Sequence, residues 1–361
     1  MHDASSSASK PSAESLLAQA NSAIAEERWA DAATLSLQAL GTSREPLHKG
    51  WIYLALGRAR WHLGAIPACC RSAINAVGLA RLAGDDGLLI DAGTLAAFSL
   101  SEIGLPALAL DFALPALEAA RRPGRHDRLP LALSCAALVY AGLGDLFRTE
   151  ECHMHALSHA RENGGHTALS LAYGNLLHSF GLIATAAQAQ GDADGLAAVG
   201  LRLKLYAGHI RSCMRQAEFE EWRVANLMIG FGAVLSLFPD GEAESERLLS
   251  DGLLRGERLG RLSYEVIEAR QALAKLRLRQ GRFEEALHVL PDAAADAARA
   301  TGWRQDEVQS LKIAHACYQA LGRSGEADVL AQRMNAAERD QARIRNQILR
   351  FLSGPRGQGF Q

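Results

Sequence analysis

The sequence predicts an all-α protein made of stacked helical hairpins, and three observations support this. Hydrophobic residues make up 48% of the chain but aromatic residues only 6%, which favours closely packed helices over strands. A turn centred on glycine recurs at Gly64, Gly104 and Gly144, at intervals of 40 residues. Alanine or cysteine follows several of the predicted turns at a fixed distance. Such a period is typical of a solenoid, in which each hairpin buries its apolar face against its neighbours.

The first hairpin is expected to begin after a disordered tail. Residues 1–11 are polar and rich in serine and alanine, so they lack the apolar surface that would offset the entropy lost on ordering. Ser12 is a suitable N-cap for the helix that follows. We expect the turn of this hairpin at Glu27-Arg28, with Trp29 opening its second helix.

The next three hairpins are expected to turn at the three glycines named above. Between hairpins lie clusters of turn residues, at 84–87, 122–124 and 162–165, where helices should stop. Glycine just past a helix end adopts the left-handed cap conformation, and proline cannot continue a helix.

The remaining hairpins are less regular. The sequence pattern that begins at Asn175 recurs at Asn226, 51 residues later. This interval indicates that the fifth and sixth hairpins are longer than the others. The seventh is expected to turn at Gly281 and the eighth at Gly322, 41 residues on.

A small residue five positions after the turn is expected to let the two helices of a hairpin approach closely. Alanine or cysteine occupies this position at Ala32, Cys69, Ala109, Ala286 and Ala327. We therefore expect residues 12–337 to form a right-handed superhelical solenoid of about eight helical hairpins.

These features resemble the tetratricopeptide repeat (TPR). The shared pattern is a turn glycine, an aromatic or aliphatic residue two positions later and then Glu/Asp-Ala, as in Gly281, Phe283 and Glu285-Ala286. The interval of 40 residues departs from the 34 of the usual repeat. It is similar to the longer repeats of bacterial transcriptional activators, peptide-sensing regulators and the sensor halves of diguanylate cyclases. The resemblance implies a TPR-like fold, but TPR arrays bind unrelated partners.

The last predicted helix extends beyond the solenoid over residues 338–352, before a tail at 353–361 that we expect to be disordered. Its apolar positions follow coiled-coil spacing with one polar interruption: Leu330, Met334, Ala337, Gln341, Ile344, Ile348 and Phe351. One expectation is a docking or dimerising seam, which would give a homodimer. The alternative is that the helix only caps the last hairpin.

Composition and motifs argue against several functional classes. A net charge of −2 gives no basic footprint for nucleic acid, and no apolar run is long enough to span a membrane. The start of the sequence lacks the pattern of a secretory signal, and the six cysteines show no paired spacing. No nucleophile elbow, P-loop, HExxH or dinucleotide-binding motif occurs. We therefore expect a non-enzymatic cytoplasmic protein without a cofactor.

One cluster carries the chemistry of a metal site. Cys152, His155 and His159 are spaced for one helix face, and thiolate and imidazole suit zinc or copper. Spacing places no fourth ligand, so the alternative is a polar helix face with Cys152 packed inside. A metal-responsive regulator is therefore the weaker hypothesis.

Recognition is expected on the first helix of each hairpin, which lines the concave groove of a TPR array. Counting back from the turns gives a mixed set of aromatic, charged and amide side chains suited to gripping a peptide: Arg58, Trp61, His62, Phe98, Glu102, His178, Gln188, Gln271, Lys275, Arg279 and Lys312. The resemblance to peptide-sensing regulators adds Asn175 and Asn226, whose amides can donate and accept to a peptide backbone.

The sequence thus favours a TPR-like scaffold that binds a peptide or protein segment in its groove, in bacterial signalling or regulation. An alternative is a small-molecule sensor whose output domain is on a partner chain. Convergence of Trp61 and Phe98 on a closed pocket would favour the sensor, whereas an open charged channel would favour a peptide.

Overall fold

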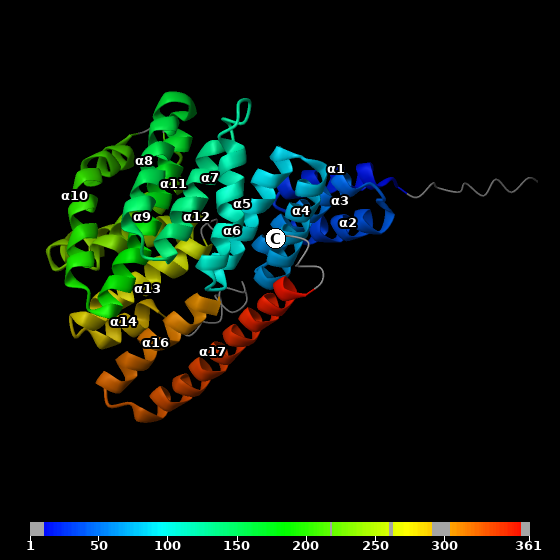
Figure 1. Ribbon diagram of the computed structural model, residues 1–361. Coiled ribbons are helices and arrows are strands. Elements are labelled where there is room, and N and C mark those ends of the chain that lie inside the picture. Colours follow the sequence, from blue (N-terminus) through cyan, green and yellow to red (C-terminus); the bar gives the residue numbers. More distant parts are fainter. Residues whose placement is uncertain (1–10, 217–218, 260–262, 291–303, 355–361) are drawn as a thin grey trace, which may run out of the picture.

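The computed structural model describes residues 11–216, 219–259, 263–290 and 304–354, which form an arc of paired helices (Figure 1). These residues contain no strand. Successive first helices of the pairs contact one another along the arc. They are α1 (Ala13–Ala25), α3 (Pro46–His62), α5 (Asp86–Glu102), α7 (Leu129–Gly142), α9 (Gly165–Gln190), α11 (Glu221–Leu235), α13 (Ser263–Arg279) and α16 (Arg304–Ala320).

Each first helix packs against the helix that follows it. The second helices are α2 (Trp29–Thr42), α4 (Ile66–Ala83), α6 (Pro106–Ala120), α8 (Leu146–His159), α10 (Ala193–Arg215), α12 (Glu242–Leu259), α14 (Phe283–Val289) and α17 (Ser324–Ser353). The all-α hairpin architecture that the sequence predicts is therefore confirmed. Ser12 caps α1, since its side chain accepts a hydrogen bond from the Ser15 amide.

The hairpin turns confirm the role of glycine. The turn glycines have a positive φ, for example 69° at Gly64 and 74° at Gly281. The residue after each glycine donates its amide to a carbonyl five residues earlier, as Ala65 does to Arg60 at 2.8 Å. This bond closes a helix end in which glycine carries no steric penalty. In the first hairpin Glu27 takes this place, with a φ of 58°.

The predicted close-packing positions are buried. Ala32, Cys69, Ala109, Ala286 and Ala327 are each at most 3% exposed. Alanine and cysteine have small side chains, which let the paired helices approach at these sites without leaving a gap.

One connection is shorter than the others. After α8 the chain continues through the π-helical turn η1 (Ala160–Gly164), and the helical run stops within the expected 162–165 cluster, at Gly165, where α9 begins without a loop. Gly165, with a φ of 61°, redirects the backbone at this point. The other irregular connection holds the 3₁₀ turn η2 (Pro239–Gly241), between α11 and α12.

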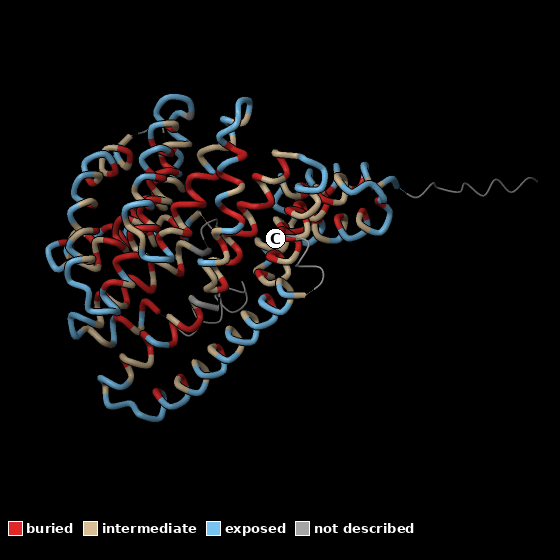
Figure 2. The backbone as a smooth tube through the Cα atoms, viewed as in Figure 1, coloured by how far each residue is buried: buried red, intermediate tan, exposed pale blue. Residues whose placement is uncertain are grey.

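The apolar core is distributed along the arc instead of lying at one centre. Figure 2 shows buried positions wherever helices face each other. The two largest clusters lie around α9 to α11 and around α3 to α6. No helix among the described residues is long and apolar enough to cross a membrane.

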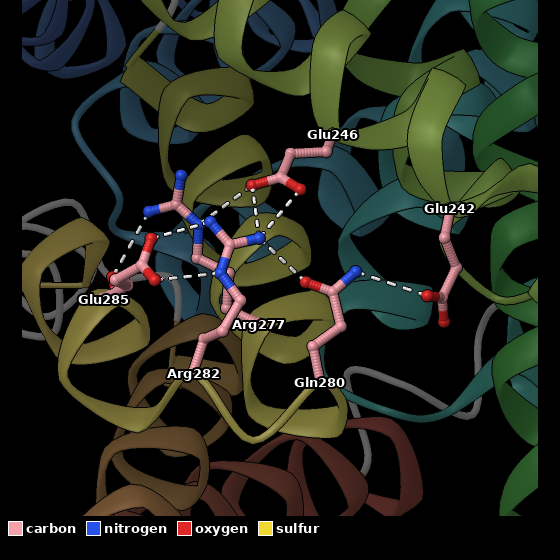
Figure 3. Close-up of polar contacts among 6 residues, drawn as sticks. All are labelled: Glu242, Glu246, Arg277, Gln280, Arg282 and Glu285. Carbon is pink, nitrogen blue, oxygen red and sulfur yellow. Dashed lines mark hydrogen bonds and ion pairs between the residues drawn. The ribbon is translucent and has the colours of Figure 1, made fainter.

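Neighbouring hairpins are also joined by charge. At the turn between α13 and α14, Arg282 donates to both carboxylate oxygens of Glu246 on α12, each at 2.9 Å (Figure 3). Arg282 also pairs with Glu285, and Arg277 adds a longer contact of 3.4 Å to Glu246. These partly exposed pairs link the hairpin of α12 to the next one along the arc.

Helix α17 first packs on α16 and then crosses to the early hairpins, so that its end contacts α4 (Figure 1). Ile348 is completely buried there, and Ile344 and Phe351 pack against the same cluster. The predicted seam is thus used within one chain. Most of the expected terminal tails, residues 1–10 and 355–361, lies outside the described residues.

Candidate functional site

The first helices enclose a cavity of about 630 Å³. Its wall is formed by the ends of α5 and α7 and by stretches of α9, α11, α13 and α16. Small and aliphatic residues make up much of the wall. Its polar side chains include Glu102, His178, Glu268, Gln271, Lys275 and Asp306.

Three carboxyl groups face this space. Burial raises the pKa of Glu102 to about 8, with a smaller contribution from the negative charge of Asp306. Burial also raises the pKa of Glu268 to about 7 and, with the Glu268 charge, that of Asp306 to about 6. Glu102 on α5 and Asp306 on α16 both line the cavity, and the negative charge of Asp306 adds to the rise in the pKa of Glu102.

The basic groups of the cavity compensate these carboxyls only in part. Burial lowers the pKa of Lys275, while Asp306 and Glu268 raise it. Burial also lowers the pKa of His178, and its Nδ1 lies 4.0 Å from Glu268 Oε1. Because a neutral imidazole does not balance a carboxylate, His178 adds little positive charge to the cavity.

Four of the thirteen residues predicted for recognition line the cavity: Glu102, His178, Gln271 and Lys275. Gln271 also has a structural task. Its amide donates to the Asp306 carbonyl at 2.9 Å and to Ser310 Oγ at 3.0 Å, and the side chain is only 6% exposed. It therefore fixes α13 to α16 and so holds Asp306 in place.

The predicted residues of the early hairpins lie elsewhere. Arg58 pairs with Asp91 at 2.9 Å, and His62 stacks on Trp29 with ring centroids 3.8 Å apart. Trp61 and Phe98, with centroids 6.5 Å apart, belong to the apolar cluster that contains Ile348. They do not converge on the cavity.

The later predicted residues also lie beside the cavity and do not line it. Gln188 is exposed, and Lys312 pairs with Glu338 of α17 at 3.1 Å. Arg279 donates to the Ser236 carbonyl at the end of α11, where a cation complements the helix dipole. Asn226 lies beside Gly174, one turn or more before the cavity-lining part of α11. Asn175 is half-buried on the side of α9 that carries His178.

The metal hypothesis is not supported by the geometry. Cys152 is buried and His155 is exposed, so the two side chains point to different environments. No group of three potential ligands assembles within the described ranges.

Glu268 and Asp306 were not predicted from the sequence. Glu268 lies three residues before Gln271, so continuing the α13 stripe by one turn finds it. Asp306 sits at the start of α16, far from the turn glycine used to set the register. Only the curvature of the arc brings it opposite Glu102.

The fold and cavity define a helical-repeat solenoid of the TPR type. No protein-family model matches this sequence, and neither does any curated protein. Among solved structures, a Rap protein complexed with competence and sporulation factor is similar, with a TM-score of 0.53 and 12% identity. The alignment covers 92% of this chain and 99% of the Rap chain.

Two further matches are more distant. Yeast Tom70 aligns over 90% of this chain and 99% of its own, with a TM-score of 0.24 and 11% identity. The TPR domain of P58(IPK) aligns over 93% and 98%, with a TM-score of 0.26 and 13% identity.

Proposed function

We propose that this chain is a non-enzymatic scaffold that binds a short, positively charged peptide segment of a partner in the cavity. The observation that carries the proposal is the set of carboxyls from three hairpins, Glu102, Glu268 and Asp306, around a space of about 630 Å³. Sites of 300–1,000 Å³ with a few converging polar groups are typical of ligand binding. A lysine, arginine or free amino group would restore full charge to carboxyls that burial keeps partly protonated.

The Rap protein, which has a similar fold, was solved in complex with competence and sporulation factor, and this supports ligand binding by a solenoid of this kind. We extend the proposal to signalling or regulation in a bacterial cytoplasm, as the repeat length suggests. The position of Trp61 and Phe98 outside the cavity favours a peptide over a small apolar ligand.

The test uses fluorescence polarisation with labelled hexapeptides that carry Arg, Lys, norleucine or Glu at one position. We expect the Arg or Lys peptides to bind and the other two to bind at least tenfold more weakly. Glu268→Gln should reduce the affinity for the cationic peptides about tenfold or more, since it removes a potential charge partner. Glu118→Gln, an exposed carboxyl on α6, is the matched control and should have no effect.

Equal binding of all four peptides, or an unchanged affinity in Glu268→Gln, would contradict the proposal. Competition by free arginine or putrescine as effective as by the peptide would instead identify a small-molecule sensor.

A further inference from the structure

The C-terminal end of α17 is a feature that the proposed function does not use. After leaving α16, the helix reaches α4 and Gly104 in the turn of the α5/α6 hairpin, which lie far earlier in the chain (Figure 1). Ile348 is 0% exposed in the cluster that also contains Trp61 and Phe98. None of the described α17 residues lines the cavity.

The docked face of α17 has the spacing of a helix bound in a groove. Ile344, Ile348 and Phe351 follow the i, i+4, i+7 pattern of apolar anchors. Leu349, next to the central anchor, is 38% exposed. One face of the helix is therefore held while the adjacent face meets solvent.

The docking depends on few interactions. Among the described residues, no ion pair connects 341–354 to another helix, and Arg343 pairs only with Asp340 of its own helix. The Arg345 guanidinium lies against Gly104, and its Nε is buried without a hydrogen-bond partner. A buried donor without an acceptor opposes the docked state. The segment is therefore held by apolar contact and by the covalent tether, which gives it a high effective concentration.

We propose that the edge formed by Trp61, Phe98, Gly104 and the start of α4 is a second binding surface, which accepts an amphipathic helix and which residues 341–352 occupy in cis. This surface, the turn edge, adjoins the cavity only at Gly104. It fits a helix with aliphatic or aromatic anchors at i, i+4 and i+7, as Ile344, Ile348 and Phe351 provide. A partner helix of this pattern would exchange with the end of α17.

The experiment compares the full chain with Ile348→Asp and with the matched control Leu349→Asp. Hydrogen exchange in 341–352 measures whether this segment is docked. Binding of a labelled peptide of residues 338–354 measures whether the turn edge is free. In Ile348→Asp we expect exchange in 341–352 to rise at least tenfold and the peptide to bind in trans. Wild type and Leu349→Asp should keep their protection from exchange in 341–352 and should not bind the peptide. A peptide that carries Ile348→Asp should bind neither wild type nor either of the two protein variants.

Circular dichroism checks that the variants remain helical, and Ile348→Ala replaces Ile348→Asp if the charged variant loses helicity. Unchanged exchange in 341–352 would show that Ile348 does not hold the segment. Failure of the wild-type peptide to bind a folded, undocked variant would show that the turn edge is not an exchangeable site. A wild-type dimer that becomes a monomer in Ile348→Asp would overturn the assignment in cis.

Discussion

Glu27 has a left-handed backbone conformation although it carries a side chain, whereas glycine takes this place in other hairpin turns. Its φ is 58°, close to the 69° of Gly64, and the closing hydrogen bond from Arg28 to Ala23 is formed at 2.8 Å. A side chain in this region costs roughly 1–2 kcal/mol. The first turn has thus kept the conformation without the residue that adopts it most easily.

We predict that Glu27→Gly raises the free energy of unfolding of the first hairpin by about 1 kcal/mol, after the extra chain entropy of glycine is subtracted. Slower hydrogen exchange in α1 and α2 would report it. The reverse change, Gly281→Ala, meets no atom within 4 Å and should lower stability through backbone strain alone. Equal exchange in Glu27→Gly and wild type would contradict the argument.

Glu102 is a residue whose ionisation should oppose folding. Its pKa in the folded chain, about 8, lies above that of an unfolded glutamate. The neutral carboxyl therefore makes its full contribution to stability below about pH 4, and this contribution is lost as the pH rises through about 8. Asp306, Glu268, His178 and Lys275 face the same cavity and titrate with it.

The side chain of Glu102→Gln stays neutral at both pH values. At pH 8.5 the free energy of unfolding of this variant should therefore exceed that of wild type by on the order of 1–3 kcal/mol. Near pH 4.5 the two free energies should be equal. Thermal unfolding at the two pH values measures this difference. Glu118→Gln, which is exposed, should match wild type at both. A constant offset for Glu102→Gln at both pH values would mean that the effect is packing and not ionisation.

At the scale of helices, the hairpin depends on small residues at the crossing. Ala286 is completely buried in a cluster with Ala274 of α13 and Ile313 of α16. Leucine there would force α14 away from both helices.

We predict that Ala286→Leu lowers the free energy of unfolding by about 1–3 kcal/mol. Urea denaturation followed by circular dichroism checks it. Ala336→Leu, on the exposed face of α17, adds the same side chain without a crossing helix and should be nearly neutral. Similar midpoints for the two variants would indicate that α14 shifts without cost.

The helices were predictable because their signals are local. A turn glycine, a cap and a small residue five positions later act within one hairpin, so Gly64, Gly281 and Ala286 could be assigned from spacing alone. The same register found Lys275 and Gln271 on the cavity side of α13.

The candidate site was only partly predictable because it depends on curvature. Spacing shows which side of α16 is polar but not that Asp306 faces Glu102 on α5, since that distance accumulates small rotations between many hairpins. Likewise, the seam of α17 predicted an apolar partner for Ile348, but not that the partner belongs to the same chain.

At the scale of the whole molecule, the carboxyls of several hairpins should act together when a ligand binds. A bound cation lowers the pKa of Glu268, which is about 7 in the free chain, so protons leave on binding. Affinity for the cationic peptide should therefore increase as the pH rises from 6 to 8.

Calorimetry in two buffers with different ionisation enthalpies would measure the released protons at pH 7. In Glu268→Gln the number should fall, whereas Glu118→Gln should release as many as wild type. A binding enthalpy that is the same in both buffers would contradict proton release.

The contact of α17 with the early hairpins has a consequence for biosynthesis. The ribosome makes the end of α17 about 230 residues after it has finished α6, a delay of roughly 10 to 50 seconds at ordinary rates of translation. During that interval the apolar cluster against which Trp61 and Phe98 pack emerges without Ile348, Ile344 and Phe351 of α17. The nascent chain therefore presents an apolar surface that only its own later segment, or a chaperone, can cover.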